Sequence, residues 1–529
     1  MDGVLQFIKA VILGIGFYFI FKIIIDLIFD FCIEKIKNTT SDNKMFQFIF
    51  EKHSFLMPLI IFIVCWIPYL IIYFPGMLVP DSSNQIIQFF GMDISATSST
   101  NSVNLIDPNV KITNHQPVLH TFILGNCMNI GKMIGNDNIG IFIYTILQTA
   151  LLASSLAYII NYMKKLKTNK WIRIFSLIVF SVLPIFPFYA IEITKDVPYV
   201  CIGIFYIGEL YKLIKNSKEK IPIKSVLPII ALSLLLCLFR NNGIYTVLLS
   251  LPFITIIAKP NRKKVLAATL SVFIIYEAFV KAVLPGVFKI PNTGVREMLS
   301  VPFQQTARYV TEHENEITNE DKEIIDKVLE YNTLSKRYVP TNADTVKNKY
   351  NKDATQEDLK KYFGVWFKHL FKHPDVYIQS FLNNYYGYVY LGSDINSYIV
   401  SANAIKNDKR LAKTGKFNYS YIKGFEKARK EAVDFLDTTK DMPIISCFSN
   451  IALNNYIILG MAVYLLYKKK YRYIIFLLPS FANILICFVS PVNAYFRYAM
   501  PNIFAMPLII SIFLSIVNGK VKDGEENSN

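Results

Sequence analysis

The sequence predicts an all-α integral membrane protein with about eleven transmembrane helices and a mostly helical extracytoplasmic segment. Its 529 residues are 53% hydrophobic and only 18% charged, and the mean hydropathy is +0.35. The apolar residues fall in blocks of the length that a helix needs to cross a bilayer, roughly 20 residues. These blocks are continuous Ile, Leu and Phe runs, whereas strands of a membrane barrel alternate polar and apolar residues over about 10 positions. Helices are therefore the predicted spanning elements.

Eleven apolar blocks qualify as predicted spans. The first follows the start MDGVLQFIK, which lacks the basic stretch and the small-residue cleavage site of a signal peptide. We therefore expect a retained helix there. The spans cover residues 5–30, 55–74, 138–162, 171–190, 197–215, 223–239, 243–258, 264–284, 446–467, 473–490 and 498–517.

These spans divide the chain into three parts. Residues 1–284 form an N-terminal transmembrane region, which includes a large loop at 75–137. Residues 285–445 form a long segment of the size of a small domain. Residues 446–529 contain the last three spans and a polar tail.

The long segment has a helical pattern. Residues 319–331 and 355–371 both carry apolar side chains at helical spacing. The second stretch starts at Thr355 with Asp358 three residues later, which is the pattern of a capping box. The segment is therefore expected to fold mainly as helices.

Basic residues set the predicted orientation. They concentrate in alternate connections between spans, and the positive-inside rule places such connections in the cytoplasm. The N-terminus and the loops 75–137 and 285–445 are then outside, and the C-terminal tail is cytoplasmic, in a multi-pass protein of a bacterial plasma membrane. This pattern also accounts for the net charge of +17, so the charge does not indicate nucleic-acid binding. The sequence contains no nucleic-acid-binding motif. The clusters are Lys35/Lys37/Lys44/Lys52, Lys164/Lys165/Lys167/Lys170, Lys212/Lys215/Lys218/Lys220, Lys259/Arg262/Lys263/Lys264 and Lys468/Lys469/Lys470/Arg472.

The seven cysteines lie mostly in apolar blocks and include no CxxC pair, so neither a disulfide framework nor a cysteine zinc site is expected.

The first polar constellation follows the second span, in PGMLVPDSSNQIIQFFG (75–91). Asp81 stands where the chain leaves the membrane, and a carboxylate there suits a general base or a metal ligand. The alternative is that Asp81 only caps a helix, because Ser82 and Gln85 resemble a capping box.

Two further constellations lie on the same predicted side. In TNHQPVLH, His115 and Gln116 suit binding of a phosphate or an acceptor hydroxyl, although capping of an amphipathic helix explains them as well. His115 and His120 are five residues apart and do not share a helical face, which argues against a zinc site on a helix. In AIEITKDVPYV, Lys195 and Asp196 interrupt an apolar stretch, where charges usually mark function. The alternative is a solvated turn with an internal Lys–Asp pair.

Arginines mark two outer turns. Arg240 and Asn242 lie in RNNG, and an Arg fork binds two phosphate oxygens at once; snorkelling to lipid headgroups is the alternative. Arg497 and Tyr498 lie in NAYFRY, where an aromatic belt is the alternative. In the long segment, VPFQQTARYV adds Gln305. The same motif adds Arg308.

The motifs PDSSNQ, NHQPVLH, TKD, RNNG, PFQQTAR and NAYFRY, in this layout of spans and loops, resemble the GT-C superfamily of polytopic membrane glycosyltransferases, and more narrowly a bacterial membrane protein family with that layout. The resemblance covers most of the chain. It implies a sugar donor on a polyprenyl phosphate and inverting transfer to a cell-envelope glycan or protein acceptor at the outer face. By the match to the acidic residue of the first loop, Asp81 is the base. Many members have a paired acidic motif here, whereas this chain has Ser82, so Asp196 becomes the second candidate carboxylate.

The substrate-binding candidates share a polar or cationic side chain in these motifs. The candidates are His115, Gln116, Lys195, Arg240, Asn242, Gln305, Arg308, Arg497 and Tyr498. A divalent metal is compatible with this set, and nothing in the sequence requires one.

Two other functions fit the same layout. An envelope glycan polymerase or ligase would depend on the outer arginines more than on Asp81. A lipid-linked sugar transporter or flippase would show inverted repeats and charges near the bilayer midplane, whereas the charges here stand at the ends of spans.

Overall fold

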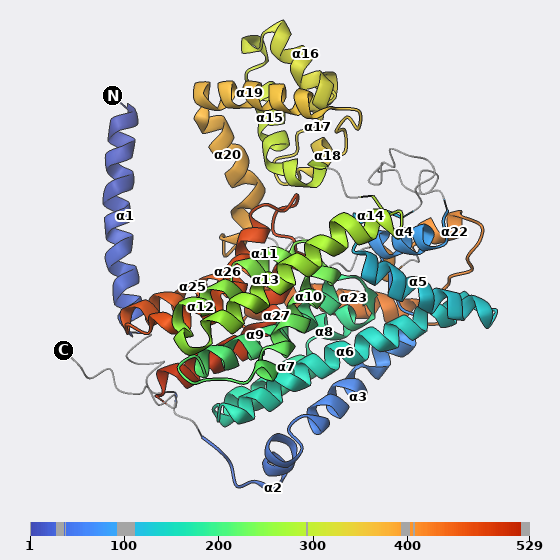
Figure 1. The fold of residues 1–529 in the computed structure, drawn as a ribbon, viewed down its shortest axis with the longest axis vertical. Coiled ribbons are helices and arrows are strands. Elements are labelled where there is room, and N and C mark those ends of the chain that lie inside the picture. The colour runs from blue at the N-terminus through green and yellow to red at the C-terminus, as the bar shows by residue number, and fades with distance from the viewer. Residues whose placement is uncertain are drawn as a thin grey trace.

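The computed structural model describes residues 2–27, 36, 39–92, 112–291, 295–392, 402–405 and 408–519. It shows a body of packed helices, a smaller lobe of helices above the body, and an N-terminal helix standing apart (Figure 1). Over these residues helices dominate, with one parallel pair of two-residue strands. The all-α class is thus confirmed. The middle of the loop 75–137, the tail beyond residue 519 and part of the first basic cluster lie outside the described residues.

Among the described residues, the N-terminal region contributes fourteen α-helices and both strands. The helices are α1 (Asp2–Leu27), α2 (Lys44–Phe46), α3 (Leu56–Ile72), α4 (Pro80–Phe89), α5 (Val118–Met133), α6 (Asp137–Lys165), α7 (Lys170–Val182), α8 (Ile185–Ile191), α9 (Asp196–Lys215), α10 (Leu227–Phe239), α11 (Gly243–Leu248), α12 (Ile254–Ile257), α13 (Arg262–Ala278) and α14 (Leu284–Gly286), and the strands are β1 (Met77–Leu78) and β2 (Glu192–Ile193).

The remaining chain adds the lobe and the C-terminal helices. The helices are α15 (Ser300–Glu312), α16 (Asn319–Val328), α17 (Leu334–Arg337), α18 (Asp344–Lys347), α19 (Gln356–Lys372), α20 (Pro374–Tyr385), α21 (Ala402–Ile405), α22 (Lys409–Lys413), α23 (Glu426–Asp441), α24 (Ile445–Ser449), α25 (Ile451–Tyr467), α26 (Leu478–Cys487) and α27 (Phe496–Val517). Short 3₁₀ or π turns join them: η2 (Gln47–Lys52), η3 (Ile223–Ser225), η4 (Leu251–Phe253), η5 (Lys259–Asn261), η6 (Phe279–Val283), η7 (Val295–Leu299), η8 (Glu314–Glu316), η9 (Tyr331–Thr333), η10 (Tyr386–Tyr388) and η11 (Tyr471–Leu477).

Among the described residues, four helices are long and apolar enough to cross a membrane, or up to six if each of two bent pairs is one span. The four are Asp137–Lys165, Asp196–Lys215, Lys259–Gly286 and Phe496–Val517. The bent pairs are Lys44–Lys52 with Leu56–Ile72 and Lys170–Val182 with Ile185–Ile191. The other predicted spans coincide with shorter apolar helices at Val11–Ile24, Ile223–Phe239, Gly243–Ile257, Ile451–Tyr467 and Tyr471–Cys487.

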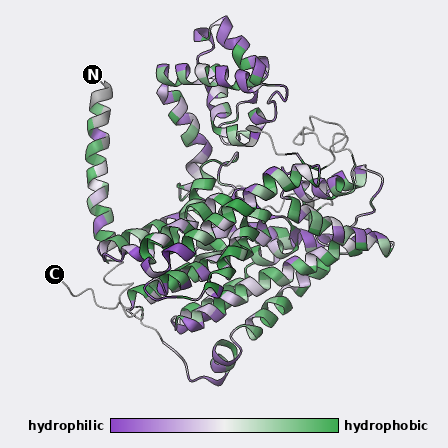
Figure 2. Ribbon diagram, in the orientation of Figure 1, coloured by the Kyte–Doolittle hydropathy of each residue, from purple (hydrophilic) through white to green (hydrophobic). Residues whose placement is uncertain are grey.

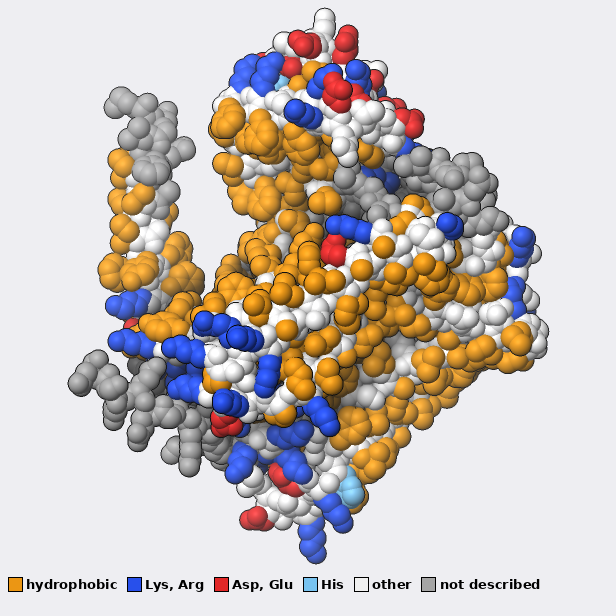
Figure 3. All heavy atoms as spheres, viewed as in Figure 1, with side chains coloured by type: hydrophobic (Ala, Val, Ile, Leu, Met, Phe, Trp, Pro, Cys, Tyr) orange, Lys and Arg blue, Asp and Glu red, His pale blue; other side chains and the backbone are white. Residues whose placement is uncertain are grey.

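One flank of the body is apolar. On α3, Ile60, Val64, Ile67 and Ile71 follow one helix face, and each is more than 40% exposed. Such a continuous face is costly in water and favourable in lipid. Figure 3 shows hydrophobic side chains covering the visible flank of the body, and Figure 2 shows that the lobe is more hydrophilic. This division is consistent with a membrane protein.

The lobe, α15–α20, has its own core. Phe303 and Tyr309 of α15 pack with Ile325 of α16 and Tyr362 of α19 in one buried cluster. The predicted helices 319–331 and 355–371 correspond to α16 and α19. The predicted capping box of α19 is present as well, since its two side chains and backbone groups exchange hydrogen bonds.

The long segment 285–445 does not fold as one unit. Its later part, from residue 408, packs over the body, where the Tyr419 hydroxyl donates to the Gly76 carbonyl (2.8 Å) and the Tyr73 hydroxyl donates to the Arg429 carbonyl (3.0 Å). The sequence did not separate these two parts, because both have the charge and spacing of helices outside a membrane.

The lobe rests on the turn that precedes α27. The Ala343 amide donates to the Pro491 carbonyl (2.7 Å), and the Asn493 amide donates to the Thr341 carbonyl (3.0 Å). The Asn493 side chain accepts from the Gly387 amide (2.9 Å). The lobe is thus bonded to a turn only a few residues before Arg497.

Candidate functional site

The short sheet brings two distant loops together. β1 and β2 are parallel, with Met77 opposite Glu192 and Leu78 opposite Ile193. Parallel strands leave a sheet at the same edge, so the segments that follow both strands emerge side by side. Asp81 follows β1 in the first turn of α4, and Lys195 follows β2 directly before α9.

Helix α6 fixes both strands. The Gln148 side chain donates to the backbone carbonyl of Glu192 at 2.7 Å, and the Thr145 hydroxyl donates to that of Pro75 at 2.8 Å. Gly76 has φ +132°, and a Cβ there would stand 2.1 Å from Thr145 Oγ1. Only glycine combines that backbone with so close an approach.

A five-residue charge cluster occupies the edge beyond the strands. Asp81 Oδ2 accepts from Lys195 Nζ at 2.9 Å and from Arg497 Nη2 at 2.6 Å. Arg497 Nε also donates to Asp196 Oδ2 at 2.5 Å. Arg240 Nη1 lies 3.5 Å from Asp196 Oδ1. The cluster therefore joins α4, α9, the turn after α10, and α27.

The cluster is buried and carries excess positive charge. The Asp196 side chain is 1% exposed, whereas that of Asp81 is 28% exposed. Three cations face two carboxylates, which leaves one positive charge without a counter-ion inside the cluster. Burying a charge without a partner is costly. Such an arrangement favours an anionic ligand.

Further predicted residues adjoin the cluster. Lys195 Nζ donates to Gln116 Oε1 at 2.5 Å. The Tyr498 ring lies 5.1 Å from the Arg240 guanidinium, within cation–π distance. His115 is half-buried beside Gln116, and Asn242 is the residue before α11, in the same turn as Arg240. That turn is tied to the histidine loop, because the Asn241 side chain donates to the Asn114 carbonyl at 2.9 Å.

Two predicted residues lie elsewhere. Gln305 and Arg308 belong to α15 of the lobe, where their side chains donate to the Tyr377 carbonyl (3.2 Å) and to Gln379 Oε1 (2.6 Å). Arg308 Nε also pairs with Glu312 at 2.9 Å. The contacts to Tyr377 and Gln379 hold α15 against α20, and none of the three contacts joins the charge cluster.

The helix-cap interpretation of Asp81 does not match the structure. The residue before α4 is Val79, and Ser82 makes the capping contacts: its hydroxyl accepts from the Val79 amide at 2.9 Å and donates to the Val79 carbonyl at 3.0 Å. The Asp81 carboxylate instead forms ion pairs with Lys195 and Arg497. The internal Lys–Asp pair expected at 195 and 196 is likewise replaced by long-range pairs to other elements.

Sequence reasoning did not identify a hydrogen-bonded chain of neutral polar side chains near the cluster. Gln85 Oε1 lies 2.8 Å from His120 Nδ1, and His120 Nε2 lies 2.6 Å from the Tyr144 hydroxyl. Burial, reinforced by Lys195, lowers the pKa of His120 to about 3. His120 is therefore neutral near pH 7. The available signal was Gln85, which stands four residues after Asp81 and so shares its face of α4.

The pKa of Asp81 shows what holds its charge. Burial raises this pKa, but the adjacent Lys195 and Arg497 cations outweigh burial and hold it well below the usual range. Glu192 is the opposite case, since burial raises its pKa well above the usual value, with only partial opposition from Arg497. These opposite shifts favour the ionised form of Asp81 and the protonated form of Glu192.

The donor set suits an anion more than a divalent metal. Both carboxylates of the cluster already contact cations, so a metal ion would have to bind beside Lys195 or an arginine at each of them, against charge repulsion. An anion such as phosphate would meet Lys and Arg donors directly.

Comparison with curated proteins and with solved structures finds no match. Residues 33–527 match a family described as "Family of unknown function (DUF6020)". The match covers nearly the whole chain, including the helical body, the lobe and every residue of the charge cluster. This protein therefore belongs to the DUF6020 family.

Proposed function

We propose that this protein is a GT-C-type membrane glycosyltransferase, which moves a sugar from a polyprenyl-phosphate-linked donor to a cell-envelope acceptor on the outer face. The observation that carries the proposal is the buried cluster of Lys195, Arg240 and Arg497 around Asp81 and Asp196, with one positive charge in excess. Its chemistry is that of a phosphate site next to a carboxylate.

The membrane setting is part of the proposal. Eleven spans in a bacterial plasma membrane, with the N-terminus outside and the C-terminus cytoplasmic, would place the cluster and the lobe at the outer face. The distribution of basic residues supports this topology: in Figure 3, many Lys and Arg side chains gather at the end of the body away from the lobe.

The cations would hold the donor phosphate. Lys195, Arg240 and Arg497 come from three separate elements and can surround one phosphate group. As the bond between the anomeric carbon and the phosphate oxygen breaks, its electron pair stays on that oxygen and negative charge grows there. Prepositioned cations in a water-poor site stabilise such charge most effectively.

Asp81 would act as the base. Both of its ion pairs use Oδ2, which leaves Oδ1 to take the proton of the acceptor hydroxyl. The acceptor oxygen then bonds to the anomeric carbon from the face opposite the phosphate, with inversion. Phosphate binding would draw Lys195 and Arg497 away from Asp81, and a carboxylate that loses nearby cations gains basicity. The base would thus become stronger only when the donor is bound.

The other residues would support these two roles. Asp196 positions both arginines, because it contacts Arg497 at 2.5 Å and Arg240 at 3.5 Å. Gln116 positions the Lys195 ammonium. His115 would border the site next to Gln116, and Asn242 would do so from the turn that holds Arg240. Tyr498 of α27 would border it through its ring, which lies 5.1 Å from the Arg240 guanidinium. We assign Gln305 and Arg308 to the packing of the lobe instead.

A transfer assay tests the proposal. Purified protein in proteoliposomes is given a polyprenyl-phosphate-linked sugar and an envelope acceptor fraction, and glycosyl transfer is measured. The same vesicles report flux of the donor across the bilayer. Transfer by wild type supports the proposal, whereas flux without transfer would support a transporter or flippase instead. Processive chain growth that survives Asp81→Asn would support a polymerase or ligase.

Donor binding has a matched control within the chain. We expect Arg240→Ala to weaken binding of polyprenyl phosphate by about 10-fold or more, since charged hydrogen bonds contribute about 1.5–3 kcal/mol. Arg173 is also a buried arginine in an ion pair, 2.8 Å from Glu51 between α7 and η2. Arg173→Ala should leave phosphate binding unchanged, and equal losses in both variants would contradict the assignment.

A further inference from the structure

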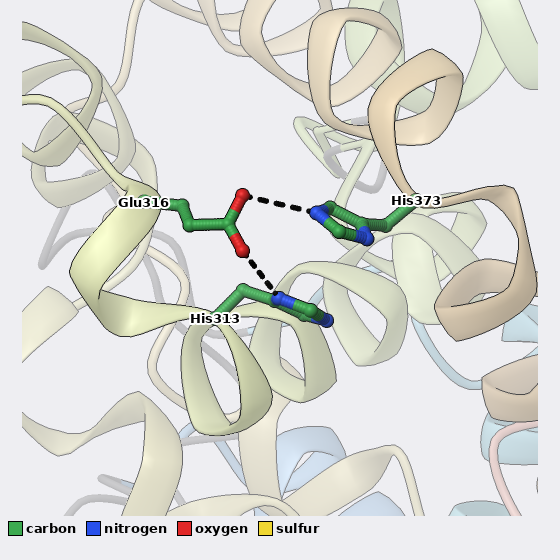
Figure 4. A group of neighbouring side chains, drawn as sticks. All are labelled: His313, Glu316 and His373. Carbon is green, nitrogen blue, oxygen red and sulfur yellow. Dashed lines mark hydrogen bonds and ion pairs between the residues drawn. The ribbon is translucent and has the colours of Figure 1, made fainter.

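The lobe contains a second chemical constellation, far along the chain from the charge cluster. His313 Nδ1 lies 2.9 Å from Glu316 Oε1, and His373 Nε2 lies 3.0 Å from Glu316 Oε2 (Figure 4). Each residue offers one ligand atom, and these three atoms all lie within 4.8 Å of one another. Among the described residues, this is where three such side chains come together.

The local fold explains the convergence. His313 directly follows α15 and His373 directly follows α19, and each backbone amide closes the last turn of its helix, on Tyr309 and His369 respectively. Glu316 comes three residues after His313, in the 3₁₀ turn η8. The two imidazole rings stack with centroids 3.8 Å apart. Two helix ends therefore point the same kind of donor at one carboxylate.

The spacing suits a metal ion. Bonds of about 2.0–2.2 Å from zinc to imidazole nitrogen or carboxylate oxygen give a tetrahedral edge of about 3.3–3.5 Å. The contacts of 2.9 and 3.0 Å, which go to the two oxygens of Glu316, are a few tenths of an ångström shorter than this edge, and the three ligand atoms all lie within 4.8 Å of one another. Two imidazoles with one carboxylate are a donor set that zinc accepts, with one position left open. Calcium and magnesium prefer sets of six or more oxygens.

We propose that His313, Glu316 and His373 form a zinc site, which clamps the end of α15 to the junction of α19 and α20. Lys372 contacts one of the two candidate ligand oxygens, since its Nζ lies 2.6 Å from Glu316 Oε2. Its side chain is 49% exposed, so it can swing into water when the ion enters. The site is separate from the charge cluster and independent of the transferase proposal.

The clamp would stabilise the lobe where α20 begins. Helix α20 leads into Gly387 and Tyr388, which bond to the turn before α27 through Asn493 and Val492. An ion that binds the folded lobe and not the unfolded chain shifts the equilibrium toward the folded state. Zinc should therefore raise the unfolding temperature of the full-length protein.

The test is zinc titration of the full-length, detergent-purified protein after chelator treatment, with metal content measured in parallel. We expect one zinc ion per chain in wild type, and at least a 100-fold weaker affinity in His313→Ala and in His373→Ala. Lys372→Ala should bind zinc more tightly, because it removes the competing cation. His53→Ala is the matched control, since His53 lies between η2 and α3 and should leave zinc binding unchanged.

X-ray absorption at the zinc edge supplies the ligand identity, with two imidazoles expected in wild type. If either alanine variant is unstable, Glu316→Gln keeps the shape of the site and should still weaken zinc binding. The proposal is overturned if wild type binds no zinc, or if the histidine variants and Glu316→Gln bind zinc as wild type does.

Discussion

Arg497 Nη2 lies 2.6 Å from Asp81 Oδ2 and joins residues 416 positions apart in the chain. The pair connects the first turn of α4 with the first turn of α27. Lys195 shares the same carboxylate oxygen. A carboxylate that two separate elements hold with cations is a strong local constraint, and it joins α4 to α27 and to the residue before α9.

Replacing Asp81 tests the proposed base. We expect Asp81→Asn to reduce glycosyl transfer by about 10²–10⁴-fold, the usual contribution of a positioned base. Membrane insertion and donor binding should persist, because Asn keeps the shape and the cations remain. Asp137→Asn is the control, since Asp137 accepts from the Asn418 amide at the start of α6 (2.7 Å). Wild-type turnover by Asp81→Asn would remove the base assignment.

Replacing Arg497 should lower the stability of the folded protein. Arg497→Gln leaves Asp81 and Asp196 without this cation, and breaking a buried pair typically costs about 3–5 kcal/mol. Adding Asp196→Asn to that variant also removes the carboxylate that lies 3.5 Å from Arg240, so the double variant should unfold at a lower temperature than Arg497→Gln alone. Donor binding should remain lost in both. If Arg497→Gln unfolds as wild type does, the ion pairs do not have the strength inferred for them.

The turn before β1 should accept only glycine. Gly76→Ala places a Cβ 2.1 Å from Thr145 Oγ1 at φ +132°, and backbone strain of this kind alone costs about 1–3 kcal/mol. We expect a lower unfolding temperature and weaker donor binding, since β1 positions Asp81. Gly364→Ala is the control, because its added Cβ in α19 would meet nothing within 4 Å. There alanine should be neutral or slightly stabilising.

Buried Glu192 predicts a specific pH dependence. Burial raises its pKa in the folded state well above the ordinary 4.5. Below pH about 4.5, Glu192 is protonated in both the folded and the unfolded chain, so its titration does not change the free energy of unfolding. Above that pH, Glu192 ionises in the unfolded chain first, and this ionisation destabilises the folded state relative to the unfolded one. Glu192→Gln should therefore raise the unfolding temperature relative to wild type at pH 7, with the difference vanishing toward pH 4. A difference that does not change with pH would contradict this explanation.

The positions of helices and polar interruptions could be read from the sequence. The long apolar blocks correspond to apolar helices, and periodicity placed α16 and α19. Charges such as Lys195, Asp196 and Arg240 stood out because they interrupt apolar stretches, and the structure brings them into one cluster. This part was predictable because the cost of charge near a membrane leaves few reasons to retain it.

Specific long-range pairings could not be predicted. Two strands of two residues each have no detectable pattern, yet they bring Asp81 to Lys195. His313 and His373 are 60 positions apart and meet only because two helices end at the same place. Gln305 and Arg308 looked equivalent to the cluster residues, but their polar side chains bond within the lobe. Nothing in local composition separates these outcomes.

The most direct test of the central claim is an experimental structure of the protein with a polyprenyl-phosphate-linked sugar bound in a lipid nanodisc. We predict that the donor phosphate lies within hydrogen-bonding distance of Lys195 Nζ and of the Arg240 and Arg497 guanidinium groups, with the anomeric carbon facing Asp81. A donor phosphate bound elsewhere, with the five-residue cluster still closed on itself, would contradict the account.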